Sequence, residues 1–274
     1  MRQLPRKITL WLAAALAVAI ACPAHSKTTT IAPQQTPLLA QTPTTTEPEL
    51  TPKIIELRQR AFRLENQGDL WGAIATYEQI LELAPQDFRA MNVIASLYGQ
   101  LGQFEQEVVW AERAIATNPE FSYAYINYGN GLVRLGRIEE AQAAFETAAQ
   151  LAPDDPLGAY SLGVLFENQG DFLSAIEFYT IAVGIDPNFE DGYFNLAAMY
   201  ANLGEFEAAL AALEKVLELN PNAEDAKAMR AAIEAELNRQ QQRYTRIIVR
   251  PSRTSLKDFV ETLRKRALPR RSQW

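Results

Sequence analysis

Proline and glycine recur at one fixed interval through the middle of this 274-residue chain. Two sets of residues each advance in steps of 34: Pro85, Pro119, Pro153, Pro187 and Pro221, and Gly68, Gly102, Gly136, Gly170 and Gly204. A fixed period of this length is typical of repeat proteins, in which each unit packs against its neighbours. We therefore divide the chain into five units, at residues 54–87, 88–121, 122–155, 156–189 and 190–223.

The apolar residues of each unit follow the period of an α-helix. In the third unit, one stripe consists of Tyr125, Tyr128, Gly129 and Leu132, and a second consists of Ile138, Ala141, Phe145 and Ala148. Gly136 lies between the stripes, where a glycine can adopt the backbone angles of a tight turn. The proline after the second stripe lacks an amide hydrogen and restricts the residue before it, so it ends the second helix. Each unit is therefore predicted to be a hairpin of two helices.

Small residues recur where the two helices of a hairpin must approach closely. Counting from the first residue of each unit, position eight holds Ala61, Ala95, Gly129, Gly163 and Ala197. Position twenty holds Ala73, Glu107, Ala141, Ala175 and Ala209. Larger side chains are expected to fill the space beside them from position twenty-four, at Tyr77, Phe145, Tyr179 and Leu213.

In period, small positions and proline, residues 54–223 resemble the tetratricopeptide repeat family. The resemblance implies an all-α fold in which antiparallel helix pairs stack into a right-handed superhelical solenoid. The second unit departs from the pattern, because Glu107 and Ala111 stand where a small and an aromatic residue are expected. That unit is either locally looser or filled by Trp110 from a neighbouring position.

A solenoid exposes an apolar end unless a further element covers it. Residues 224–242 are predicted to be a capping helix, with Asn222 as its N-cap. Its inner face would be formed by Ala226, Met229, Ile233 and Leu237, and its other side is polar.

The first helices of stacked hairpins line a concave surface, which is where we expect a partner. Positions two, five, six and nine of these helices project into it, and the groove candidates are Arg89, Asn92, Tyr123, Asn127, Asn130, Tyr160, Ser161, Phe194 and Asn195. Amides can hydrogen-bond an extended peptide backbone, and aromatic rings add apolar contact area. The alternative is a solvated polar face whose rings serve packing between units. Some members of the family clamp a carboxylate with lysine, arginine and asparagine, but the basic residues that should accompany Asn127 and Asn130 are missing.

The first 26 residues have the anatomy of an export signal. Three early cations, Arg2, Arg6 and Lys7, precede an apolar run to Cys22 that is short for a membrane span. Cys22 either carries a lipid, as in bacterial lipoproteins, or leaves with a signal cleaved after Ala24 or Ser26; an uncleaved signal anchor is the further alternative. Residues 27–53 are rich in Thr, Pro and Gln and are expected to form a disordered linker.

Charge divides the chain into an acidic body and a basic tail. Residues 54–238 hold 10 Lys and Arg against 29 Asp and Glu, whereas residues 239–274 hold 11 against 2. The tail, residues 243–274, contains a predicted amphipathic helix whose apolar face is Leu256, Phe259, Val260 and Leu263. This helix could contact the acidic body or a protein partner, or lie on anionic lipid. The charge of the acidic body argues against nucleic acid as its ligand.

The composition argues against catalysis, because Cys22 and His25 are the only thiol and imidazole of the chain. Thiol nucleophiles, histidine-dependent triads and ordinary zinc sites all need such side chains. We expect no enzyme activity, no cofactor and no metal. The leading hypothesis is an exported, periplasmic or membrane-tethered scaffold that binds a protein or peptide in its groove during assembly of an envelope complex. The alternative is a membrane-associated tethering protein that uses a lipidated Cys22 or the basic tail.

Overall fold

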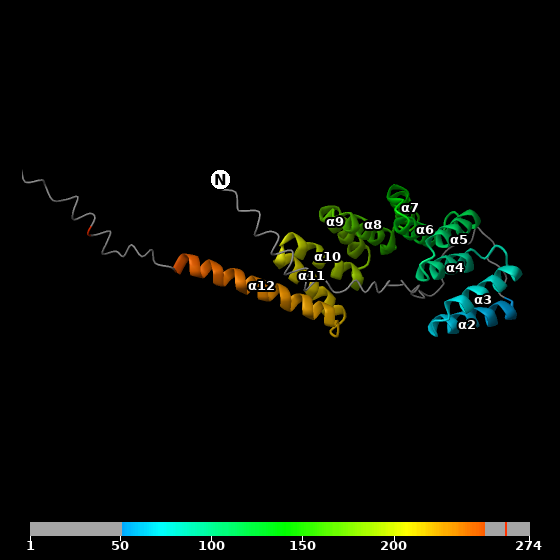
Figure 1. Cartoon of the computed structure of the whole chain (residues 1–274), viewed down its shortest axis with the longest axis horizontal. Helices are drawn as coiled ribbons and strands as arrows, with labels where there is room; N and C mark the ends of the chain where they lie inside the picture. The colour runs from blue at the N-terminus through cyan, green and yellow to red at the C-terminus, as the bar shows by residue number, and fades with distance from the viewer. Residues whose placement is uncertain (1–50, 250–260, 262–274) are drawn as a thin grey trace, which may run out of the picture.

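The computed structural model describes residues 51–249 and the single residue Glu261. All regular structure in the described part is helical, which confirms the predicted all-α class (Figure 1). The first helices of the five units are α2 (Pro52–Asn66), α4 (Phe88–Gln100), α6 (Ser122–Arg134), α8 (Pro156–Gln169) and α10 (Glu190–Leu203). The second helices are α3 (Leu70–Leu83), α5 (Phe104–Thr117), α7 (Ile138–Leu151), α9 (Phe172–Ile185) and α11 (Phe206–Leu219), and α12 (Glu224–Val249) follows them.

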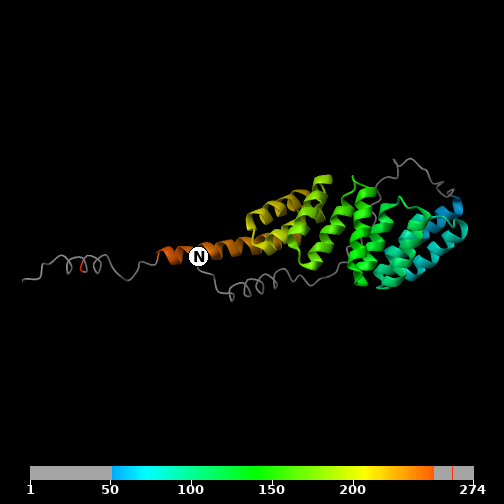
Figure 2. The same ribbon diagram turned by 90° about the horizontal axis from the view of Figure 1, so that it is seen from above.

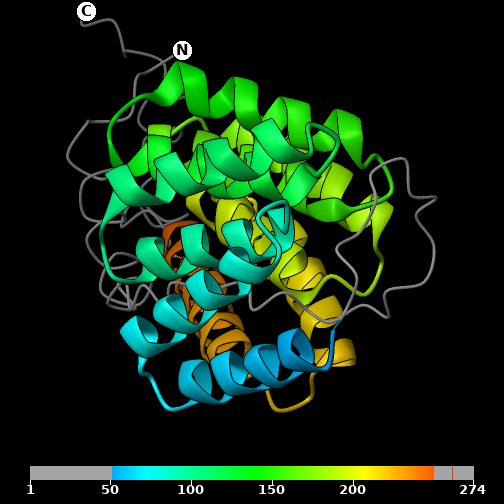
Figure 3. The same cartoon turned by 90° about the vertical axis from the view of Figure 1, so that its right-hand side faces the viewer.

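Each helix packs against the next along the chain, so the pairs are the predicted hairpins. The first helices also contact one another from unit to unit, as α4 does α6 and α6 does α8, and they therefore form one continuous wall. Figures 2 and 3 show the hairpins stacking along the long axis and winding around it. The stack is thus a superhelix, and its right-handed sense stays a prediction.

The turns within the hairpins depend on the periodic glycines. All five have positive φ, between 73° and 78°, a backbone region that other residues enter at a cost. Several helix starts are capped by side-chain oxygens. Asp69 accepts a hydrogen bond from the Gly72 amide at 2.9 Å, for example. These local features explain why the sequence period was enough to place the helices.

The small positions bring the paired helices together as predicted. A Cβ atom on Gly163 would lie 2.6 Å from the ring of Tyr179, which is itself fully buried. Phe145 and Leu213, at the same position as Tyr179 in their units, are also buried. Tyr77 is only partly buried, and its hydroxyl donates to Glu65 at 2.9 Å. Side chains at position twenty-four therefore fill the hairpin interior in four units.

The second unit accommodates a large residue, Glu107, at position twenty. Glu107 is only 5% exposed, and its carboxyl group packs directly against Gly99. A Cβ atom added to Gly99 would lie only 2.6 Å from Glu107 Oε1. On the other side, a Cβ on Gly131 would be 3.3 Å from Glu107 Cγ. Trp110 is buried in the core of the first two units, together with Ala111. The unit is therefore compact: Gly99 and Gly131 leave room for the larger residue at position twenty, and Trp110 is buried in the same cluster as Ala95 and Ala111.

The capping helix is longer than predicted and begins without the predicted cap. It continues to Val249 instead of ending at 242. Asn222 lies in the preceding turn, where its backbone amide donates to Asn220 Oδ1 at 3.1 Å. The inner face is confirmed, because Ala226 and Ile233 are buried and Met229 and Leu237 pack against the same core. From residue 238 to residue 245 every side chain is exposed.

Several predictions fall on residues outside the described part. These are the export signal with Cys22, nearly all of the linker, and the tail beyond Val249 apart from Glu261, which is helical and exposed. None of the described helices is long and apolar enough to span a bilayer.

Candidate functional site

The candidate site is the wall formed by the first helices of the hairpins. Of the nine predicted groove residues, Asn130 is exposed and Ser161 is buried, and seven are partly exposed: Arg89, Asn92, Tyr123, Asn127, Tyr160, Phe194 and Asn195. The Ser161 hydroxyl donates to the carbonyl of Leu157 in its own helix at 2.8 Å, so Ser161 offers little to a ligand. Eight of the nine predicted groove residues are therefore at least partly accessible to a ligand, and Ser161 alone among the nine is buried.

Asparagine side chains join neighbouring units along this wall. Asn127 Nδ2 donates to Asn92 Oδ1 at 2.8 Å and to the Asn92 carbonyl at 3.2 Å. Two units further on, Asn195 Nδ2 donates to the Tyr160 hydroxyl at 3.0 Å and to that of Tyr179 at 3.3 Å. In each case position six of one unit bonds position five of the unit before it. The amide groups are therefore fixed in orientation, because their nitrogen atoms are committed to the wall.

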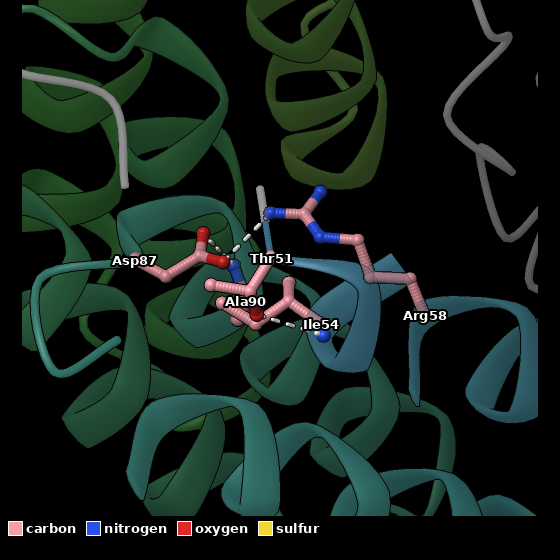
Figure 4. A network of polar contacts seen from close by, with 5 residues as sticks. All are labelled: Thr51, Ile54, Arg58, Asp87 and Ala90. Carbon is pink, nitrogen blue, oxygen red and sulfur yellow. Dashed lines mark hydrogen bonds and ion pairs between the residues drawn. The ribbon is translucent and has the colours of Figure 1, made fainter. Parts of the chain in front are cut away.

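Aspartates at two unit boundaries link the wall at the starts of the first helices. Asp87 accepts from the Ala90 amide at 3.1 Å, which caps α4, and from Arg58 Nη2 at 2.7 Å (Figure 4). Asp155 likewise accepts from the Leu157 amide at 2.9 Å and from the Tyr123 hydroxyl at 2.8 Å. Each carboxylate therefore caps the first helix of the next unit and holds a side chain of its own unit.

The pair of Arg58 and Asp87 is the more deeply placed of these links. The Asp87 side chain is 2% exposed, whereas that of Arg58 keeps about one third of its surface in solvent. Arg58 Nε is buried, and no group in residues 51–249 accepts a hydrogen bond from it. A buried ion pair of this kind costs desolvation, so its loss on one side leaves an uncompensated charge in the interior.

Aromatic rings occupy the same position at the other two unit boundaries, and each packs on a ring of its own unit. Phe121 packs on Phe88 with a centroid separation of 4.9 Å, and Phe189 packs edge-on against Tyr160 at 5.0 Å. Burial, together with the nearby charge of Asp191, raises the pKa of Tyr160 above its ordinary range. The Tyr160 hydroxyl is therefore neutral at physiological pH. The Tyr160 ring packs against Tyr179 and Phe189 of its own unit, and its hydroxyl accepts a hydrogen bond from Asn195 of the next unit.

The first unit contributes groove residues that the sequence analysis did not select. Ile55, Arg58 and Phe62 occupy positions two, five and nine of α2, and Ile55 and Phe62 are 44% and 53% exposed. The same positional rule, applied to the first unit, would have found them. They give the amino-terminal end of the wall an apolar surface on both sides of the Arg58 guanidinium.

The described residues contain no group of three or more His, Cys, Asp or Glu side chains placed to hold a metal ion. The polar groups of the wall are amides, hydroxyls and paired charges. Such groups can form hydrogen bonds to the backbone of a bound polypeptide.

Similarity to known proteins agrees with this architecture. Two tetratricopeptide repeat family models match the chain, one at residues 60–122 and 128–188 and the other at residues 190–223. Among solved structures, the tetratricopeptide repeat protein TTC0263 of Thermus thermophilus is 20% identical; the match covers 66% of this chain and 98% of that one, with a TM-score of 0.58. The Cut9–Hcn1 hetero-tetramer of APC/C also matches, at 20% identity over 66% of this chain and 36% of that chain, with a TM-score of 0.57.

Curated relatives share only part of their length with this chain. The protein CTR9 homolog of Arabidopsis thaliana is 26% identical over 123 residues, which are 43% of this chain and 11% of that protein. The cytochrome c-type biogenesis protein CycH of Bradyrhizobium diazoefficiens is 32% identical over 116 residues, which are 41% of this chain and 31% of that protein. The matches to the repeat models extend over more than half of the sequence, and the chain therefore belongs to the tetratricopeptide repeat family.

Proposed function

We propose that this protein is a non-catalytic scaffold that binds an extended segment of another protein along the wall of first helices. The observation that carries the proposal is the fixed orientation of the asparagine amides. Asn127 is held by two hydrogen bonds through Nδ2, and within residues 51–249 its Oδ1 accepts none. An oxygen held in this way can accept a hydrogen bond from a peptide amide without first losing rotational freedom.

Exposed groups on the same wall supply the remaining contacts. Asn130 lies nearly one helical turn after Asn127 and is exposed, and Phe194 keeps part of its ring in solvent. Ile55 and Phe62 add apolar area at the amino-terminal end. Together these give the pattern of an extended ligand: backbone hydrogen bonds along its length and a few apolar side chains at intervals.

The setting that we propose is assembly of an envelope complex outside the cytoplasm. Two arguments support it: the export signal that the sequence predicts at residues 1–26, and the similarity of the repeats to a cytochrome c-type biogenesis protein. Mass spectrometry of the mature amino terminus tests this part separately. A terminus at Met1 in the cytoplasmic fraction would contradict it, whereas an acylated Cys22 or a terminus after residue 24 or 26 would support it.

Capture of partners from envelope extract tests the groove itself. We expect Asn127→Ala combined with Asn130→Ala to reduce recovery of the captured protein by about tenfold, the loss of one to two good hydrogen bonds. Gln150→Ala is the matched control, because Gln150 is an exposed amide on the second helix of the same unit. Equal recovery with the double variant and the control, both folded by circular dichroism, would refute the groove as the binding site.

A tethering function is the second candidate, because residues 239–274 carry 11 Lys and Arg against 2 Asp and Glu. It predicts that the full chain floats with anionic liposomes at low salt and that a chain ending at residue 238 does not. Flotation that is independent of the tail would exclude this candidate.

A further inference from the structure

Helix α9 has an apolar face that no described element covers. Leu173, Glu177 and Ile181 follow one another at intervals of four residues on its outer side, and Leu173 and Ile181 are 70% and 43% exposed. Glu177 is the single charged residue of the helix. A helix that is apolar on all sides is normally enclosed by its neighbours.

The second helices of the other units are not apolar at both of these positions. Where α9 has Leu173, the helices α5, α7 and α11 have Glu105, Glu139 and Glu207, all exposed. Where α9 has Ile181, the same helices have Arg113, Thr147 and Lys215. Helix α3 has Trp71 at the first position and a glutamine, Gln79, at the second. The pair of exposed apolar residues on either side of Glu177 is therefore a property of the fourth unit and not of the repeat pattern.

The two units that contain and follow this face are strongly acidic. Residues 156–223 contain 10 Asp and Glu against one basic residue, Lys215, whose amine already pairs with Glu218 at 2.6 Å. Residues 250–274 have the opposite balance, with 8 Lys and Arg against 2 Asp and Glu. The amphipathic segment predicted at 255–265 combines an apolar face with Lys257, Arg264 and Lys265, so it is complementary to α9 in both properties.

The geometry of α12 bears on which copy of the tail can reach α9. Residues 238–249 carry the helix about 18 Å beyond Leu237, its last contact with the stack. Figures 1 and 2 both show this half of α12 extending away from the other helices. Helices α10 and α11 lie between α9 and α12, which separates their axes by about 16 Å or more. The five residues 250–254 span at most about 17 Å, short of the return path of about 24 Å.

We propose that the amphipathic segment 255–265 of a second copy of this chain docks on the outer face of α9, between Leu173 and Ile181. The Leu256, Phe259, Val260 and Leu263 side chains cover the apolar pair, and the basic side chains face Glu177 and its acidic surroundings. Reciprocal exchange of the two tails closes a twofold dimer, so the contact does not propagate into a filament. The contact is on the opposite side of the hairpins from the groove and is independent of the groove's function.

Complementation between two variants of the full chain tests the proposal. Copies with two different affinity tags are produced in one cell and co-purified from detergent extract, so that shared membrane cannot join them. We expect Leu173→Glu in both copies to lower co-purification by roughly tenfold or more. The substitution places a charge at the apolar side chain that the docked tail would bury. Phe259→Glu in both copies is expected to do the same. When one copy carries Leu173→Glu and the other Phe259→Glu, one intact face meets one intact tail, and co-purification returns.

Val109→Glu is the matched control for the α9 variant, because Val109 is 46% exposed on the outer side of α5. It is expected to leave co-purification at the level of the unaltered chain. The proposal is overturned if Leu173→Glu behaves like Val109→Glu. It is also overturned if the mixed pair is not recovered, as docking within one chain or binding of the tail to lipid alone would require.

Discussion

Replacing Glu107 by glutamine should stabilise the protein and remove most of a pH dependence centred on the second unit. Burial raises the pKa of the Glu107 carboxyl to about 8, and the positive charge of Arg134 opposes this only in part. No side chain in residues 51–249 donates a hydrogen bond to the carboxyl, which lies against the backbones of Gly99 and Gly131. Glutamine has the same shape and carries no charge to desolvate.

The sign and size of the effect follow from linkage. An unfolded glutamate ionises near its ordinary pKa of 4.5, whereas the folded group keeps its proton until about pH 8. Between these values the folded state binds more protons, so the free energy of unfolding falls as pH rises, by about 1.4 kcal/mol per pH unit. Below and above this window the Glu107 contribution is constant. The total loss is about 4–5 kcal/mol, which is large beside the roughly 5–15 kcal/mol that stabilises a typical domain.

Urea unfolding of the chain and of Glu107→Gln, followed by circular dichroism from pH 5 to pH 9, measures this difference. Other carboxyls with raised pKa, among them Glu65 and Glu167, contribute equally to both proteins and cancel in the comparison. The two curves should converge near pH 5 and separate towards pH 8, with the variant more stable. Parallel curves across the whole range would refute the assignment of a buried, protonated carboxyl.

A double-mutant cycle tests the packing side of the same argument. Gly99→Ala alone forces a Cβ to within 2.6 Å of the Glu107 carboxyl and should destabilise, by about 1–3 kcal/mol. In a Glu107→Ala background the carboxyl is gone and the added methyl group fills part of the cavity. The cost of Gly99→Ala should then disappear or reverse, and an unchanged cost would show that the two sites are not in contact.

Three further substitutions and one truncation test packing, a buried charge and the exposed half of α12. Gly163→Ala should destabilise by about 1–3 kcal/mol in thermal unfolding because of the ring beside it, whereas Gly184→Ala, which meets nothing within 4 Å, should stabilise by about 0.5–1 kcal/mol. Arg58→Ala leaves Asp87 buried without its cation and should cost about 3–5 kcal/mol, with faster hydrogen exchange at the start of α4; unchanged exchange there would contradict the link. Deletion of everything after Leu237 should leave the unfolding midpoint of the stack within about 2 °C, since residues 238–245 are all exposed; a larger fall would place stabilising contacts on this half of α12.

The sequence predicted the architecture because the information is local and repeated five times. A glycine with positive φ, a proline two residues after each second helix and small residues at two positions each act within one hairpin. The position of the buried Glu107 side chain depends on Gly99 in α4 and Gly131 in α6. The sequence does not show that these two glycines lie next to Glu107, because their proximity arises only when the units stack. The inward rotation of Ser161 and the length of α12 were missed for a similar reason. A buried hydroxyl can bond its own helix, and a polar helix has no apolar pattern to mark its end.

The unit boundaries explain how one wall combines two kinds of surface. The last position of the first four units is Asp87, Phe121, Asp155 and Phe189, so acids and rings alternate along the stack. Each acid caps the first helix of the next unit and holds a donor from its own unit, whereas each ring packs on a ring of its own unit. The acids therefore join neighbouring units directly, and Phe121 does so through its contact with the ring of Tyr123. Polar and aromatic boundaries alternate along the stack, and we predict that substituting an acid disturbs two units whereas substituting Phe189 disturbs mainly its own.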